Sequence, residues 1–186
     1  MKKVLGLILV AALMLTAFAV SCTLATATGA VEVRVTDAPA NNITSVNVTV
    51  DAIMIHRAGA GNESGWEPIS IVVNGNVTAN VTFDLYRIVD NETVLGYEPL
   101  VEAGNYTQLR MHIVSVNVTI DGELRSASVP SEWLKLVRPF EVVNGGTTTL
   151  VIDFDVAKSI VVTGAGEVKL KPVVRLLVME SEGLIE

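Results

Sequence analysis

The stretch SVNVTVDAIMI, residues 45–55, decides the fold, because apolar and polar residues alternate along it. In a β-strand, successive side chains point to opposite faces, so the valines of this stretch share one face and the polar residues share the other. The alternation changes phase at Asp51–Ala52 and then resumes, which is typical of a β-bulge. The stretch therefore predicts one long strand with a buried face and a bulge near its middle.

The same period of two returns along most of the chain, between turns rich in glycine and asparagine. The further alternating stretches are 31–35, 76–85, 109–120, 149–156 and 167–178. We expect each to be a strand, with Val77 facing the core and Pro172 placing the last strand at a sheet edge, since proline cannot donate to a ladder. No helical period appears beyond the N-terminus. The pattern predicts an all-β protein, a single antiparallel β-sandwich over residues 30–180.

The N-terminus has the features of a secretory signal peptide, which we place at residues 1–21. Lys2 and Lys3 precede an unbroken apolar run that ends at Val20. Cys22 follows directly and resembles the cysteine of a lipobox, so we expect it to be lipidated and followed by a tether over 22–29. Two alternatives are cleavage after Ala27 and an uncleaved membrane anchor, since the run nearly reaches the length of a membrane span. All three predict an exported protein at the outer face of the cell membrane or outside the cell.

Charge and cysteine content narrow the function classes. The chain of 186 residues has a formal net charge of −7, and loss of residues 1–21 removes Lys2, Lys3 and no acid, which gives −9. A domain this acidic is not expected to bind nucleic acid, because phosphate contact needs a basic surface. Cys22 is the only cysteine, so no internal disulfide is expected.

Most asparagines of the chain occur in one short sequence pattern. Of eleven asparagines, eight begin an Asn-X-Ser/Thr triplet, which is the acceptor for N-glycosylation. The eight are Asn42, Asn47, Asn62, Asn76, Asn80, Asn91, Asn105 and Asn117. Simple alternation with threonine outside explains the four triplets in strands, but it does not explain the four in turns. We therefore expect glycosylation, with alternation as the competing interpretation for the strand triplets.

Several segments, in order, carry a family resemblance. They are VEVRVTDAPANNITSVNVTVDAIMIHRA from residue 31, GW at 65–66, FDL at 83–85, AGNYTQLRMHI at 103–113, VPS at 129–131 and TTTLVIDFDVAKSIVVTGAGEVKLKPVVRL at 147–176. With them, the chain resembles domain-of-unknown-function family 4382, found in secreted and often lipid-anchored prokaryotic proteins. The resemblance implies a β-sandwich of the transthyretin or carbohydrate-binding-like type without an established activity. AGNYT is also similar to a segment of surface modules that act as stalks or adhesive units.

Few residues are suited to catalysis or metal binding. His56 and His112 are expected to be outward strand residues, and no nucleophile elbow occurs. Asp37, Asp153 and Asp155 would offer the oxygen ligands that calcium prefers if their strands met. The competing interpretation is that these acids cap turns or form ion pairs with basic residues at strand ends. Apart from this calcium site, no cofactor is expected.

Trp66 and Trp133 are the candidates for ligand binding, because sugar recognition uses aromatic platforms. The competing interpretation makes them half-buried covers at the ends of the sandwich. The leading hypothesis is a non-enzymatic cell-surface module with a structural or adhesive role, held to the membrane by lipid at Cys22 or by an uncleaved anchor. The alternative is a carbohydrate-binding surface module. Glycans or other surface proteins are the expected partners.

Overall fold

The computed structural model describes residues 26–38, 43–88 and 92–181. Cys22 with the predicted signal peptide, Asn42 and Asn91 lie outside these residues. The elements, in chain order, are β1 (Thr28–Ala38), β2 (Ile43–Arg57), β3 (Trp66–Ile69), β4 (Val72–Val73), β5 (Asn76–Val77), β6 (Val81–Asp84), η1 (Leu85–Arg87), β7 (Thr93–Glu102), β8 (Gly104–Ile120), β9 (Glu123–Ser128), β10 (Trp133–Val142), β11 (Thr147–Asp155), α2 (Val156–Ser159), β12 (Ile160–Val162), β13 (Val168–Leu170) and β14 (Val174–Ser181). The all-β prediction is confirmed.

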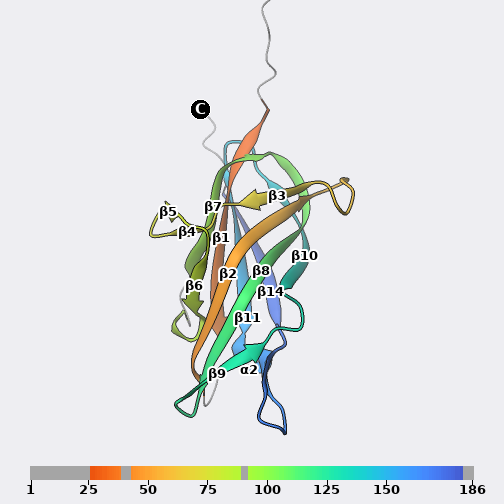
Figure 1. Ribbon diagram of the computed structural model, residues 1–186. Coiled ribbons are helices and arrows are strands. Elements are labelled where there is room, and N and C mark those ends of the chain that lie inside the picture. The colour runs from red at the N-terminus through yellow and green to blue at the C-terminus, as the bar shows by residue number, and fades with distance from the viewer. Residues whose placement is uncertain (1–25, 39–42, 89–91, 182–186) are drawn as a thin grey trace, which may run out of the picture.

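Two sheets pack face to face along the long axis of the molecule (Figure 1). The smaller sheet has the order β14-β11-β1-β7. The larger sheet has the order β12-β13-β9-β8-β2-β3, and β10 and β6 also pair with β8 and β2. Two pairings depart from the antiparallel prediction, since β1 pairs with β11 and β9 pairs with β13 in parallel. No helix in these ranges is long and apolar enough to cross a membrane.

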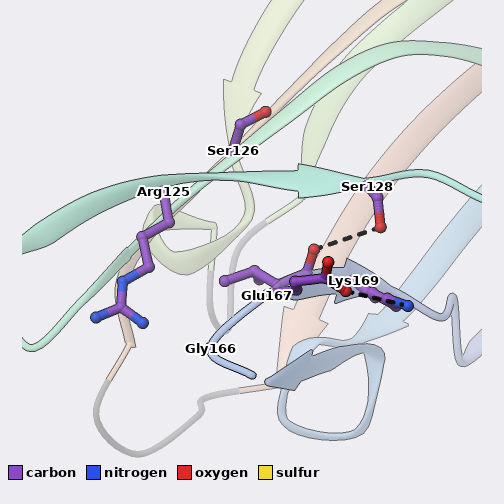
Figure 2. A pocket seen from close by; sticks show the side chains of 7 residues that line it. Arg125, Ser126, Ser128, Gly166, Glu167 and Lys169 are labelled. Atoms are coloured by element: carbon purple, nitrogen blue, oxygen red, sulfur yellow. Dashed lines mark hydrogen bonds and ion pairs between the residues drawn. The ribbon is translucent and has the colours of Figure 1, made fainter. Parts of the chain in front are cut away.

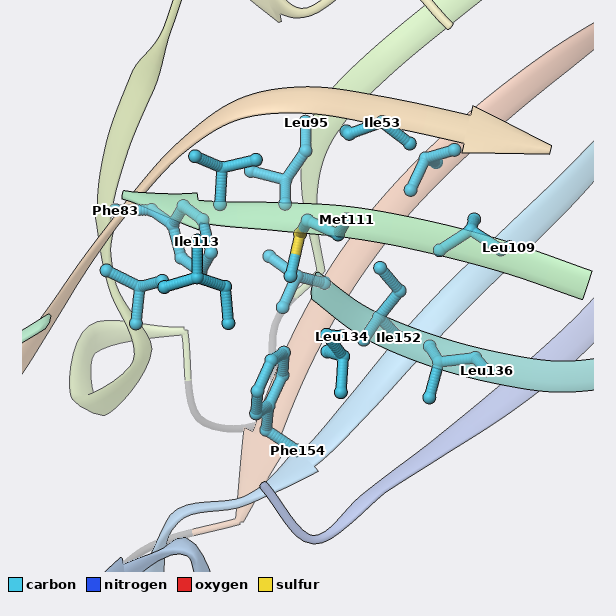
Figure 3. Packing of buried hydrophobic residues seen from close by; sticks show 14 of the residues in the cluster. Ile53, Phe83, Leu95, Leu109, Met111, Ile113, Leu134, Leu136, Ile152 and Phe154 are labelled. Carbon is cyan, nitrogen blue, oxygen red and sulfur yellow. The ribbon is translucent and has the colours of Figure 1, made fainter. Parts of the chain in front are cut away.

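The core lies between the sheets and is built from the alternating apolar residues. Ile53, Leu109 and Met111 extend from the larger sheet towards Ile152 and Phe154 of β11 (Figure 3). All five are 1% exposed or less. Because the inner faces of β2 and β8 are filled in this way, the residues between them, such as Arg110, must lie on the outer face of the larger sheet.

The bulge predicted in β2 is confirmed. The register with β8 shifts between Thr49 and Val50 and again between Val50 and Ala52. On β8 the shift leaves Val114 52% exposed, between the buried Ile113 and Val116. The extra residues let both strands keep their apolar side chains inside on either side of the bulge.

The stretch 76–85 is not one strand, so this prediction is wrong. Asn74 and Gly75 both adopt positive φ angles, 51° and 78°, and form a two-residue hairpin between β4 and β5. An Asn-Gly pair favours this turn, which suits the twist of the two strands it joins. The hairpin draws residues 76–77 away from the sandwich and leaves Val77 73% exposed, whereas β6 pairs with β2.

The last predicted strand is also divided. β13 ends at Leu170 in the larger sheet, and β14 begins at Val174 in the smaller sheet. Pro172 lies in the crossing, where the flanking amides of Lys171 and Val173 donate to the backbone oxygen and side chain of Ser159 at 2.7 and 2.9 Å. Proline has no amide hydrogen and suits this break in the ladder. The edge position predicted for the final strand is confirmed for β14.

Candidate functional site

The two tryptophans meet on the outer face of the larger sheet, at opposite sides of one arginine. Trp66 begins β3 and Trp133 begins β10, with β2 and β8 between these strands. The Arg110 Cζ atom lies 3.8 Å from the ring centroid of Trp66 and 4.4 Å from that of Trp133. Both distances are within the range of a cation–π interaction. We call these three residues the Trp–Arg–Trp cluster.

The preceding loop fixes the indole of Trp66. Gly65 adopts a φ of +79°, which L side chains rarely allow, and so turns the chain into β3. The Trp66 Nε1–H group donates to the Asn62 carbonyl oxygen at 3.0 Å. The His56 ring lies edge-on to the indole with centroids 4.7 Å apart, and its Nε2 atom is 3.0 Å from the Gly61 oxygen. The prediction that His56 is an outward strand residue is wrong in one respect, since Trp66 and this loop leave it only 5% exposed.

The indole of Trp133 packs against a second histidine. The ring centroids of Trp133 and His112 are 4.9 Å apart. His112 Nδ1 lies 2.6 Å from an Asp51 carboxylate oxygen, and Nε2 lies 3.6 Å from Glu132. The hydrogen bond with Asp51 raises the pKa of His112 above its ordinary value. Asp51 and Glu132 are therefore directed towards the imidazole at the edge of the cluster.

The guanidinium of Arg110 has no carboxylate partner among the described residues. Its Nη2 group donates to the Met54 sulfur at 3.2 Å, a weak acceptor, and its buried Nε group makes no hydrogen bond. Lys135 lies opposite Arg110 in the β8–β10 register, is exposed, and has no ion pair in the same part of the chain. By contrast, Arg34 pairs with Glu32 at 2.6 Å. Two neighbouring cations thus lack counter-charges on an acidic protein.

This arrangement is suited to binding rather than to bond cleavage. The two indoles present apolar ring surface, and both contact the guanidinium, which reduces the side-chain freedom that Arg110 would lose on binding. Guanidinium N–H groups match the two oxygens of a carboxylate. Trp66 and Trp133 were both expected to be half-buried, and this is confirmed, but they cover an outer sheet face and not the ends of the sandwich.

The three predicted calcium ligands do not form one cluster. Asp37 is 6% exposed, and its Oδ1 atom accepts from the Val156 amide at 3.0 Å. Asp153 pairs with Arg175 at 3.1 Å, and Asp155 pairs with the lysine three residues later, at 2.6 Å. The ion-pair interpretation is thus confirmed for the last two acids. The described ranges contain no group of three His, Cys, Asp or Glu residues that could hold a metal. Calcium binding therefore has no support from the described residues and stays a prediction.

Six of the predicted glycosylation sites lie in the described residues. Asn62, Asn76, Asn80 and Asn105 are exposed. Asn47 and Asn117 are half-buried and directly opposite each other on β2 and β8. On the same face the Ser45 and Thr119 side chains lie 2.8 Å apart, and Asp84 of β6 lies opposite Asn47. Glycosylation at all eight sites stays a prediction.

A hollow lies between β9 and β13, away from the Trp–Arg–Trp cluster. It is lined by Arg125, Ser126, Ser128, Gly166, Glu167, Val168 and Lys169. Figure 2 shows Arg125 extending away from Glu167 and Lys169. Both cations already have carboxylate partners, Arg125 with Glu123 at 2.7 Å and Lys169 with Glu167 at 3.5 Å. No aromatic residue lines the hollow. It is therefore a weaker candidate than the Trp–Arg–Trp cluster.

The fold and the site define a β-sandwich domain with an aromatic and cationic surface on one sheet. Residues 28–172 match the model of the family described as "Domain of unknown function (DUF4382)", and the chain belongs to this family. The resemblance seen in the sequence is thereby confirmed for the family, while lipid anchoring stays a prediction.

Two solved structures are similar at low identity. One, from Bacteroides eggerthii DSM 20697, is described as a "putative cell adhesion protein". Its TM-score is 0.39 and its sequence identity is 14%, and the match covers 84% of this chain and 56% of that chain. The other, from Bacteroides ovatus ATCC 8483, has the same description, with a TM-score of 0.24, 8% identity, and coverage of 86% and 46%. The chain thus spans about half of each, and TM-scores this low carry no argument about its function. Among curated proteins, none matches the chain.

Proposed function

We propose that the protein is a non-enzymatic cell-surface module with a structural or adhesive role. The single observation behind this proposal is the Trp–Arg–Trp cluster, a preformed surface on the outer face of a sheet. A cluster on the outer face of a sheet suits contact with an extended partner, because such a partner can lie across several neighbouring strands. The signal sequence expected at residues 1–21 and the cysteine at position 22 support export and attachment to the membrane.

A deletion strain of the native host tests this proposal. It would be complemented with the full-length wild-type protein or with the Trp66→Ala/Trp133→Ala double variant. Cell attachment to surfaces and to other cells would be measured, together with protease accessibility of the protein on intact cells. Tyr97→Ala is the matched control, because Tyr97 is an exposed aromatic residue, 39% exposed, on β7 of the other sheet.

We expect the deletion to reduce cell attachment. The wild-type protein and the Tyr97→Ala control should restore attachment, whereas the Trp66→Ala/Trp133→Ala double variant should not restore it. Wild-type attachment in the deletion strain would contradict the adhesive role. A purified protein that turned over a substrate at ordinary enzyme rates, about 1 s⁻¹ or faster, would contradict the non-enzymatic role.

The second candidate function is carbohydrate binding, which the convergence of both tryptophans on one arginine favours. Indole rings stack on the apolar faces of sugar rings, and neighbouring polar groups give direction to the contact. A panel of neutral and acidic glycans, tested against the wild type and the single Trp66→Ala and Trp133→Ala variants, checks this function. Absence of binding, or binding that neither change weakens, would remove it.

A further inference from the structure

We infer that the Trp–Arg–Trp cluster binds a carboxylate-bearing polysaccharide, with Arg110 and Lys135 holding the carboxylate. The inference rests on the proposed function and adds the chemical class of the partner. It begins from the charges at the cluster. Arg110 and Lys135 are neighbours across the β8–β10 register, and neither has an acid partner in the described ranges. Two adjacent cations repel each other, and an anion bound between them would remove that repulsion.

The acids nearest to the cluster are committed elsewhere. Glu67, which lies beside Trp66 in the chain, accepts a hydrogen bond from the Tyr106 hydroxyl at 3.0 Å and lies 3.8 Å from Arg57. Asp51 and Glu132 are both directed to His112. None of the three forms an ion pair with Arg110, so the guanidinium charge is left for an external anion. The formal net charge of −7 means that such binding depends on this local pair of cations and not on the whole protein.

The aromatic residues indicate a sugar rather than a small inorganic anion. Trp66 and Trp133 both lie within 4.4 Å of the Arg110 Cζ atom and so place apolar ring surface next to the anion position. A uronate ring offers both complementary parts, because it has apolar C–H groups on its ring and a carboxylate at one carbon. The planar guanidinium can bind that carboxylate through two parallel N–H···O bonds.

The surface beyond the cluster favours an extended chain over a single sugar. β2 and β8 continue past the bulge, and the residues on their outer face there are uncharged and polar. These residues are Ser45, Asn47, Thr49, Ser115, Asn117 and Thr119. A chain bound on this face requires Asn47 and Asn117 to carry no glycan, which corresponds to the alternation interpretation of the strand triplets. Hydroxyl and amide groups donate and accept hydrogen bonds with successive sugar hydroxyls. The His112–Asp51 pair lies between this face and the cluster along the same two strands, so a bound chain would pass over it.

Biolayer interferometry with the immobilised full-length protein tests the inference. The probes are polygalacturonate, its fully methyl-esterified form, and dextran sulfate. Methyl esterification removes the charge and keeps the sugar backbone, whereas dextran sulfate carries charge on a different backbone. We expect saturable binding of polygalacturonate and at least about tenfold weaker binding of the ester, because a charge-assisted contact is lost.

Two variants and one control locate the binding. We expect Arg110→Gln to weaken polygalacturonate binding at least about tenfold, and Lys135→Gln to weaken it about two- to fivefold because Lys135 is exposed. Arg175→Gln removes the same charge on the smaller sheet, from a residue whose side chain is 81% exposed, and is expected to change binding less than about twofold. Lys135→Gln, a surface change, keeps the test decisive if Arg110→Gln fails to fold.

Four results would overturn the inference. Three are no binding of polygalacturonate, equal binding of the methyl ester, and an equal loss with Arg175→Gln and Arg110→Gln. The fourth is dextran sulfate binding as tight as that of polygalacturonate, since general charge attraction would then be the cause. If binding fails while attachment of cells still depends on the two tryptophans, the proposed function stands and only the ligand class is wrong.

Discussion

Replacing Tyr106 with phenylalanine removes a buried hydroxyl near the start of β8. The single hydroxyl proton is shared between a Glu67 carboxylate oxygen at 3.0 Å and the Glu102 carbonyl oxygen at 2.9 Å, and the residue is 1% exposed. Its ring stacks on Phe140 with centroids 5.5 Å apart, and phenylalanine keeps this contact. The change therefore tests the hydroxyl alone.

The expected loss follows from these contacts. A neutral hydrogen bond contributes about 0.5–1.5 kcal/mol and one to a charged group about 1.5–3 kcal/mol. The full charged value does not apply, because Glu67 is 30% exposed and keeps a contact with Arg57. We expect Tyr106→Phe to lower the free energy of unfolding by about 1–2 kcal/mol, or the midpoint temperature by about 2–8 °C for a domain of this size.

The pH dependence supplies a second readout. Burial raises the pKa of Tyr106, and the hydrogen bond with Glu67 raises it further. As pH rises past the ordinary tyrosine value of about 10, the unfolded chain loses this proton while the folded protein keeps it. The stabilisation is therefore complete below about pH 10 and is lost at higher pH. The gap in stability between wild type and Tyr106→Phe should narrow above pH 10.

Thermal unfolding followed by circular dichroism measures both effects, with Tyr97→Phe as the control. Tyr97 is 39% exposed, so its change should stay within about 0.5 kcal/mol of wild type. A Tyr106→Phe protein that melts within 1 °C of wild type at pH 7, or a gap that is constant up to pH 11, would refute the reasoning.

Three further changes have defined outcomes. Gly65→Ala should lower the free energy of unfolding by about 1–2 kcal/mol, because φ is +79° and the added Cβ would lie 2.3 Å from the Ala60 Cβ. An unchanged thermal unfolding midpoint would contradict this. Asp51→Asn should lower the pKa of His112, measured by NMR titration. It should also remove the stability that the His112–Asp51 pair contributes below pH 6.5, which the wild type loses as pH rises through the raised pKa of His112. An unchanged pKa of His112 would count against the pairing. Asp37→Ala should cost about 1–3 kcal/mol in urea unfolding, because the amide that begins α2 loses its buried acceptor, and no change in the urea midpoint would show that the bond is unimportant.

The alternation of residues predicted the sandwich because it reports which face of a strand is buried. The bulge in β2 was visible as a change of phase at Asp51. The same signal failed at Val77, where an Asn-Gly turn paired the residue with β4 and drew it away from the core. It failed again at Pro172, because a period of two does not say to which of two sheets a strand belongs.

The candidate site was predictable only in part. Trp66 and Trp133 were identified by residue type, but 66 positions separate them and only the register of four strands brings them to one arginine. Arg110 was missed as a site residue. Its signal was present in the sequence, since it alternates with the inward Leu109 and Met111 and so lies on the outer face. The absence of an acid partner became visible only in three dimensions.

Intrinsic fluorescence can show whether the Trp–Arg–Trp cluster binds a carboxylate-bearing polysaccharide. The chain contains two tryptophans, and both belong to the Trp–Arg–Trp cluster. A titration of the full-length protein with polygalacturonate, at constant ionic strength, therefore reports binding at this surface alone. The account predicts a saturable change in tryptophan emission that Arg110→Gln abolishes and that Arg175→Gln preserves. Emission that stays constant throughout the titration, or that changes equally in both variants, would contradict it.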